Sequence, residues 1–444
     1  MKILKRVMAT KHKLGHALLA SVFCAALTAP AVASEAPFAF SVRDRVLVVA
    51  PHPDDEALST GGLIQSAVEN KAAVKVVYLT YGDDNEIASL FYLKKPLLLS
   101  KDILKMGKVR ENEAEKAMVS LGLSPQDLFF LGYPDSGLLI LWRRVWGMVR
   151  PFRHFLTNID RVPYADSYKP GSLYRGENIA RDLREIIETY RPTHIFVTAP
   201  FDRHPDHQAA YLFLSLALLD LREKAAETEV YVYLVHFPEW PPLKGYLPAE
   251  WLKAPPPVSG SGRVSWLMDS LSISEVKAKK SILEKYSSEV VYSKKNLMSF
   301  VRANELFGRV MPEKAALGTQ ELLGEPRRAC FAVENGELWV SAPLEDFDER
   351  GAFTTEIYGW RTNKDFGQMP KLALRLFGNR LFVKDRMRDV FIQGILFKLE
   401  KNRVLIRVPL AALGAPEVIF TRMETSSEKA SLDFGSSRIL EISA

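Results

Sequence analysis

Cysteine is almost absent from this chain, which has only Cys24 and Cys330 among its 444 residues. Cys24 lies in a segment that we expect to be removed, so one cysteine remains and an intrachain disulfide is excluded. No histidine-bearing motif surrounds Cys330, which argues against a nucleophilic cysteine. The chain also lacks a Gly-x-Ser-x-Gly elbow, a P-loop and a dinucleotide-binding fingerprint, so those hydrolase and nucleotide-binding classes are not indicated.

Acidic side chains are missing from the first 33 positions, although five of the 59 Lys and Arg residues lie there. Beyond them basic and acidic residues are nearly equal in number, which argues against a nucleic-acid or other general polyanion binder. The basic start, the apolar run over 17–27 and Ala31-Val-Ala33 predict a secretory signal peptide, residues 1–33, cleaved after Ala33. An uncleaved membrane anchor is the alternative, but the run is short for a span. We therefore expect an exported protein, periplasmic or extracellular.

The length of the chain favours two domains, which we place at 41–311 and 327–444 with a linker at 312–326. In the first domain, buried strands alternate with helices, which indicates right-handed βαβ units. The fold expected there is α/β, a Rossmann-like open and mainly parallel sheet with helices on both faces. The predicted strands cover 45–50, 73–79, 127–131, 193–199 and 230–236, and the helices 57–71, 109–121, 179–190 and 208–224. A loop at 237–263 and two further helices at 273–288 and 294–307 complete this domain.

Residues 138–171 interrupt this alternation with aromatic residues interleaved with arginines. Such a segment can cover the core, form a lid over a substrate or contact a membrane surface, and the sequence leaves all three open.

The pattern changes after residue 327 to short alternating runs separated by Gly, Asn and Asp, for example at 353–358, 372–377 and 404–408. This pattern predicts an antiparallel β-sandwich. Sandwiches of this kind accompany secreted sugar-active enzymes and can bind carbohydrate. The aromatic residues Trp339, Tyr358, Trp360 and Phe366 could form a sugar platform, or they could pack in the core or between domains.

Two His/Asp clusters follow predicted buried strands. Pro51-His-Pro-Asp-Asp-Glu56 places one imidazole and three carboxylates in a loop after the first strand, and His204-Pro-Asp-His207 follows the fourth. Both clusters therefore project from the carboxyl edge of one sheet, where ligands of open α/β folds bind. Crowded carboxylates need a compensating cation, and two histidines with one carboxylate and an open position suit a catalytic zinc.

The motif Pro51-His-Pro-Asp-Asp-Glu56 together with His204-Pro-Asp-His207 resembles the two signatures of the LmbE-like, or PIG-L, family of zinc-dependent de-N-acetylases. Members of that family remove acetyl groups from N-acetylglucosaminyl compounds. The resemblance extends through Gly61-Gly62, Arg110 with Glu113, the turn at 132–137 and the helix at 277–288, and it covers roughly residues 41–310. It does not include the C-terminal region, and residues 138–171 look longer than the connection usual in the family.

Carried over by position, the resemblance implies His52, Asp55 and His207 as ligands of one Zn²⁺ ion per chain. It also implies Asp54 as the general base that takes a proton from the metal-bound water. It implies that a protonated His204 stabilises the oxyanion or protonates the leaving amine, with Asp206 orienting it. For Asp54 the alternative is a helix N-cap. Glu56 is expected to be a supporting or capping residue rather than a ligand.

Arg110, Asp135, Arg203 and His236 are candidates for substrate contact. Arg110 and Asp135 could equally form a buried ion pair that supports the loops, and His236 could be a structural histidine.

The sequence thus predicts an exported zinc-dependent N-deacetylase acting on an N-acetylated amino sugar within a glycan, glycolipid or envelope polymer. One alternative keeps the zinc amidase but gives it a small acylated glycoside as substrate. The other is a non-catalytic glycan-binding protein that retains the metal site, and the presence of Asp54 argues against it. Contact with an envelope or membrane surface is a further expectation.

Overall fold

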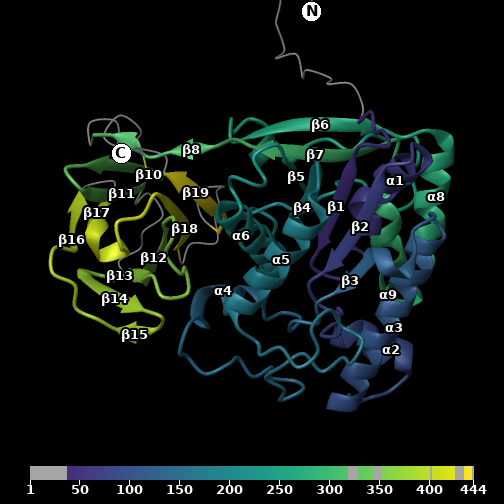
Figure 1. Cartoon of the computed structure of the whole chain (residues 1–444), viewed down its shortest axis with the longest axis horizontal. Helices are drawn as coiled ribbons and strands as arrows, with labels where there is room; N and C mark the ends of the chain where they lie inside the picture. Colours follow the sequence, from purple (N-terminus) through teal and green to yellow (C-terminus); the bar gives the residue numbers. More distant parts are fainter. Residues whose placement is uncertain (1–37, 319–328, 344–351, 401–402, 426–434, 443–444) are drawn as a thin grey trace, which may run out of the picture. The chain divides into compact units, whose positions relative to one another are not determined.

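The computed structural model describes residues 38–318, 329–343, 352–400, 403–425 and 435–442 (Figure 1). The predicted signal peptide and most of the predicted linker lie outside these residues. The described residues fall within one compact unit that spans residues 35–444. The boundaries proposed for the two domains inside that unit stay a prediction.

The first half of the chain is built on a seven-stranded sheet of order β3-β2-β1-β4-β5-β7-β6. Its strands are β1 (Arg45–Ala50), β2 (Ala73–Tyr78), β3 (Leu128–Phe130), β4 (His194–Thr198), β5 (Glu229–Tyr233), β6 (Val264–Ser270) and β7 (Asn304–Val310). The first five pair in parallel. Residues 46–50 are completely buried, which explains why β1 is a continuous apolar run. Because β1 lies between β2 and β4, the strand order reverses there, and ligands of such sheets bind at this position.

Helices follow the strands as the sequence predicts. They are α1 (Asp55–Glu69), α2 (Glu86–Leu93), α3 (Ser100–Val119), α4 (Leu138–Arg144), α5 (Gly176–Tyr190), α6 (Pro205–Asp220), α7 (Pro256–Ser259), α8 (Ile273–Leu283) and α9 (Ser287–Leu297). In Figure 1, α5 and α6 lie on one side of the central strands, and α1 and α8 lie on the other. The predicted α/β fold with helices on both faces is confirmed.

The prediction of a helix at 294–307 is wrong in its second half. Helix α9 ends at Leu297, and residues 304–310 form β7, which pairs antiparallel with β6 along its whole length. Residues 304–308 are all buried, and a short run buried on both faces cannot be assigned to strand or helix by periodicity alone.

The C-terminal region forms two facing sheets, β16-β17-β11-β10-β9 and β15-β14-β13-β12-β18-β19-β8. Their strands are β8 (Glu313–Lys314), β9 (Ala316–Leu317), β10 (Cys330–Glu334), β11 (Glu337–Pro343), β12 (Ala352–Trp360), β13 (Lys371–Phe377), β14 (Arg380–Asp385), β15 (Arg388–Asp389), β16 (Leu396–Glu400), β17 (Arg403–Pro409), β18 (Val418–Thr425) and β19 (Ser437–Glu441). Apolar residues of both sheets, such as Val340 and Ile357, share one core. The predicted antiparallel sandwich is confirmed, and β8 and β9 add short parallel edges from the predicted linker.

Segment 138–171 covers the core, which is one of its three predicted roles. Trp142 and Trp146 are buried, and the Trp142 ring lies 5.2 Å from Phe213 of α6 and 5.1 Å from Phe420 of β18. Phe366, Tyr358 and Trp360 are buried in the same cluster. Those three aromatic residues pack against the first domain, which is the interdomain packing that the sequence left open beside a sugar platform.

Candidate metal and catalytic site

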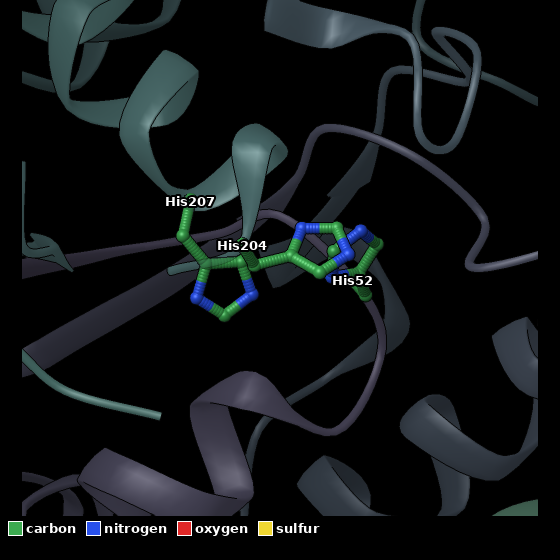
Figure 2. Close-up of side chains that lie close together, drawn as sticks. All are labelled: His52, His204 and His207. Atoms are coloured by element: carbon green, nitrogen blue, oxygen red, sulfur yellow. The ribbon is translucent and has the colours of Figure 1, made fainter. Parts of the chain in front are cut away.

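The two polar clusters meet because β1 and β4 are neighbouring parallel strands. Residues 51–54 form the loop between β1 and α1, and residues 199–204 form the loop between β4 and α6. Figure 2 shows the imidazole rings of His52, His204 and His207 grouped together, with His204 and His207 at the start of α6. Side chains about 150 positions apart in sequence are therefore in contact.

Asp55 joins the two histidines predicted to bind the metal. Its Oδ2 lies 3.2 Å from Nδ1 of His52 and 3.3 Å from Nε2 of His207. His207 is fully buried, and neither of its ring nitrogens makes a hydrogen bond within the described residues. The structure thus brings the three predicted ligands together around one carboxylate oxygen.

Further side chains surround these three. Within the described parts of the chain, three sets have ligand atoms within 4.8 Å of one another: His52 with His204 and His207, Asp55 with His207 and His236, and His52 with Asp135 and Asp206. Imidazole nitrogens and carboxylate oxygens are ligands that zinc accepts. The donor set therefore fits a divalent ion of this kind.

Asp54 is held in a strained backbone conformation. Its φ of 121° lies in a region that non-glycine residues rarely adopt. Although Asp54 precedes α1, its side chain makes no capping hydrogen bond, so the N-cap alternative is wrong. Burial raises the pKa of Asp54 well above 3.8, Arg110 opposes this shift, and Asp55 adds to it.

Arg110 ties the loops of the site together. It is buried and donates hydrogen bonds to the carbonyls of Gly82 (2.8 Å) and Pro53 (2.6 Å). Its guanidinium also lies 3.1 Å from Glu289 and 3.4 Å from Asp54. A Cβ at position 82 would meet the guanidinium carbon at 2.6 Å, so glycine is needed there. These contacts favour the supporting ion-pair interpretation of Arg110.

Two further predicted carboxylates face His52. Oδ1 of Asp135 lies 3.1 Å from Nε2 of His52, and Oδ2 of Asp206 lies 3.3 Å from the same atom. Asp206 also accepts the main-chain N–H groups of Ser136 (2.6 Å) and Leu138 (2.9 Å).

The predicted orienting role of Asp206 toward His204 does not match these contacts. The contact described between the two residues runs from the main-chain N–H of Asp206 to Nδ1 of His204. Burial, with His52, His207 and His236 nearby, lowers the pKa of His204 to about 2. The protonated form, on which the role implied by the resemblance depends, is disfavoured in this arrangement.

The remaining predicted residues, Arg203 and His236, occupy different environments. Arg203 is exposed, and its main-chain N–H donates to the carbonyl of His236 (3.1 Å). The His236 ring lies 4.9 Å from the ring of His207, between centroids. Both side chains are exposed, and of the two the His236 ring belongs to the cluster.

Asp202 is a residue of the site that the sequence prediction missed. It is fully buried, and its Oδ2 lies 3.4 Å from Nδ1 of His207. The same carboxylate accepts the main-chain N–H groups of Val235 (3.0 Å) and His236 (2.9 Å). The second nitrogen of a metal-ligating histidine commonly has such a partner. The presence of an acid close to the His204–His207 motif could therefore have identified Asp202 from the sequence.

The C-terminal sheets contact the loop that carries His204. Gln208, next to His207, donates to the carbonyls of Asp202 (2.6 Å) and Gly435 (3.1 Å). Arg422 of β18 donates to Oε1 of Gln208. Arg422 and Gly435 thus hold the start of α6 in place.

A cavity of about 440 Å³ opens beside the cluster. Asp54 and His236 line it at one end, together with residues of the α2 and α9 regions, among them Asn85, Glu289 and Tyr292. A larger cavity of about 570 Å³ lies elsewhere, between α6 and residues 360–367, and none of the predicted site residues lines it. The smaller cavity is therefore the candidate substrate site.

Comparison with known proteins finds a matching family model and similar proteins. Residues 47–218 match the family model PIG-L, described as GlcNAc-PI de-N-acetylase. A 1D-myo-inositol 2-acetamido-2-deoxy-alpha-D-glucopyranoside deacetylase of Mycobacterium sp. (strain KMS) is 31% identical over 42% of this chain and 54% of its own length. The chain thus spans about half the length of that curated relative.

Two solved structures show weaker similarity. A deacetylase of the teicoplanin biosynthesis pathway is 20% identical, with 60% of this chain and 98% of that chain covered and a TM-score of 0.39. The N,N'-diacetylchitobiose deacetylase from Pyrococcus horikoshii is 17% identical, with 61% and 84% covered and a TM-score of 0.32.

Proposed function

Because residues 47–218 match the PIG-L family model, we propose that the protein is a metal-dependent N-deacetylase of N-acetylated amino sugars. The observation that carries the proposal is the position of Asp54, a carboxylate next to the cluster in which Asp55 joins His52 to His207. A carboxylate that does not bind the metal can accept a proton, whereas a ligating carboxylate is committed to the cation. The curated relatives named as acetamido-sugar deacetylases support the same reaction.

We propose zinc as the metal, one ion per chain, held by His52, Asp55 and His207. The donor types of the cluster, and the position of Nε2 of His207 beside the Asp55 carboxylate, support this assignment. When bound, the ion would polarise the acetamide carbonyl and make a coordinated water more acidic.

Residues of the chain then assist each step of the hydrolysis. Asp54 accepts the proton of the attacking water, whose oxygen adds to the acetamide carbon. The carbon–nitrogen bond breaks as the amine nitrogen takes that proton from Asp54, and the free amine and acetic acid leave, the acid ionising to acetate in water. Arg110 keeps the Asp54 carboxylate in place, and His204 is the proposed hydrogen-bond partner of the developing oxyanion.

The substrate proposed is an N-acetylglucosamine-type residue of a glycan, glycolipid or envelope polymer. A cavity of about 440 Å³ is of the size that small-molecule sites have. Export through the predicted signal peptide belongs to this proposal, since it would bring the enzyme to substrates outside the cytoplasm.

Acetate release from N-acetylated chito-oligomers tests the proposal. We expect release that a chelator abolishes and added Zn²⁺ restores. Asp54→Asn should lower the rate by about 10²–10⁴-fold, the usual contribution of a general base, while zinc binding is retained.

Other outcomes would change the assignment. Release from small acylated glycosides alone would favour the narrower amidase. Failure to release acetate from any acetamide, with glycan binding retained, would favour a non-catalytic glycan-binding protein and overturn the proposal.

A further inference from the structure

Helix α2 exposes its largest apolar side chains instead of burying them. The helix buries Ala88 and Ser89, whereas Ile87 is 50% exposed and Phe91 is 58% exposed. Residues four apart share one face of a helix, so Ile87 and Phe91 form a single apolar stripe. A surface helix normally turns that stripe toward the core. The arrangement indicates that the outward face of α2 has an apolar partner.

Neighbouring segments extend this apolar face. Tyr292 of α9 stacks on Phe91 with 5.9 Å between ring centroids, and it is half exposed, as is Val291 beside it. In the connection from α2 to α3, Leu97 is 72% exposed and Leu99 is 52% exposed. We call these six residues the apolar rim: Ile87, Phe91, Leu97, Leu99, Val291 and Tyr292. Figure 1 shows α2, α3 and α9, the elements next to the rim, close to one another.

Lysines border the apolar rim. The exposed lysines of residues 86–105 and of α9 are Lys94, Lys95, Lys101, Lys105, Lys294 and Lys295. The acids of residues 86–105 are Glu86 and Asp102. Asp102 is buried and already pairs with Lys95. The border is therefore positively charged, and apolar side chains among lysines are the composition that binds anionic lipid surfaces.

The apolar rim also borders the mouth of the candidate substrate cavity. Asn85, which caps α2, and Tyr292 of α9 line the cavity that contains Asp54. A surface bound by the rim would consequently lie beside the opening to the catalytic residues.

We propose that the apolar rim and its lysines dock the protein on the surface of an anionic lipid bilayer, with the cavity mouth at the lipid interface. Within the described ranges, no helix has the length and apolar character to cross a bilayer. The proposed contact is made by surface side chains of the rim. The site of contact differs from the membrane contact considered for 138–171, whose tryptophans are buried. The proposal goes beyond the proposed function and does not depend on it.

Vesicle co-sedimentation tests the docking. The protein is used from Ser34 onward, because residues 35–444 form one compact unit and the apolar run before them would itself bind lipid. We expect binding to vesicles of equal parts phosphatidylcholine and phosphatidylglycerol, weak binding to phosphatidylcholine alone, and loss of binding as salt is raised. The double variant Phe91→Ser/Leu97→Ser should weaken binding at least about tenfold, since both side chains would insert into the interface.

A matched control is available on the C-terminal sandwich. Phe391 is almost fully exposed there, and Phe391→Ser should leave vesicle binding unchanged. The charge reversal Lys94→Glu/Lys101→Glu tests the rim without removing an apolar contact and should also weaken binding. Equal binding by all variants would overturn the proposal. So would self-association of the protein, measured by sedimentation velocity without lipid, that Phe91→Ser/Leu97→Ser abolishes, because the rim would then join two copies of the chain.

Discussion

The carboxylate of Asp202 lies 3.4 Å from Nδ1 of His207, and both side chains are fully buried. Burial raises the pKa of Asp202, but His207, His236 and main-chain N–H groups hold it well below 3.8. Asp202 is therefore an anion that fixes the orientation of the His207 ring and leaves Nε2 on the side of Asp55.

Replacing Asp202 by Asn should weaken zinc binding by about 10–100-fold, the usual effect of losing the partner of a ligating histidine. Competition with a chromophoric chelator measures this affinity independently of activity. Asp44→Asn is the matched control, because Asp44 lies 3.7 Å from Nδ1 of His194 outside the cluster. Equal zinc affinity in Asp202→Asn and the unmodified protein would contradict the orienting role.

Replacing Arg422 by Ala should lower kcat/KM by about tenfold. The side chain of Arg422 holds Gln208, whose neighbour His207 is a predicted ligand, and the loss of a charge-assisted hydrogen bond costs about 1.5–3 kcal/mol. Arg143→Ala is the control, because Arg143 pairs with Glu356 of the same sandwich without touching the loop before α6. If both variants lower activity equally, the effect is on domain packing and not on the loop.

Asp54→Gly should be more stable than Asp54→Ala by at least about 1 kcal/mol. Both variants lack the carboxylate and should be inactive, but only glycine adopts a φ of 121° without strain. Urea unfolding of the two variants isolates the backbone contribution. Equal stability would show that the conformation of residue 54 relaxes when its carboxylate is absent.

Asp269→Asn should stabilise the protein at pH 8 and have little effect near pH 4. Burial, with Glu305 nearby, raises the pKa of Asp269 from 3.8 to about 7. Between these values the folded state binds a proton that the unfolded state releases, so the free energy of unfolding falls as pH rises and the loss is complete above about pH 7.

The size of this effect is at most about 4 kcal/mol at pH 8, since one pKa unit corresponds to about 1.4 kcal/mol. Urea unfolding at the two pH values measures it. Asp389→Asn, at a largely exposed position, serves as control. A stability difference between Asp269→Asn and the unmodified protein that stays the same at both pH values would contradict the raised pKa.

The strands at 45–50 and 193–199 and the polar clusters after them can be predicted from the amino-acid sequence alone. Each is a local signal, an apolar β-branched run stopped by proline, and parallel strands bring their carboxyl ends to one edge. This reasoning was sufficient to bring the two clusters together, whereas the choice of His52, Asp55 and His207 as ligands came from the family resemblance. The alternating runs of the C-terminal region were likewise sufficient for the sandwich.

Which groups these residues contact depends on the folded protein and could not be predicted. Arg110 bonds to carbonyls 28 and 57 positions away, and Gln208 bonds to Gly435, 227 positions away. The strand at 304–310 was mistaken for helix because its partner strand, not its own periodicity, fixes its conformation. Local patterns encode the period of a segment, whereas hydrogen-bond and ion-pair partners depend on how distant segments pack together.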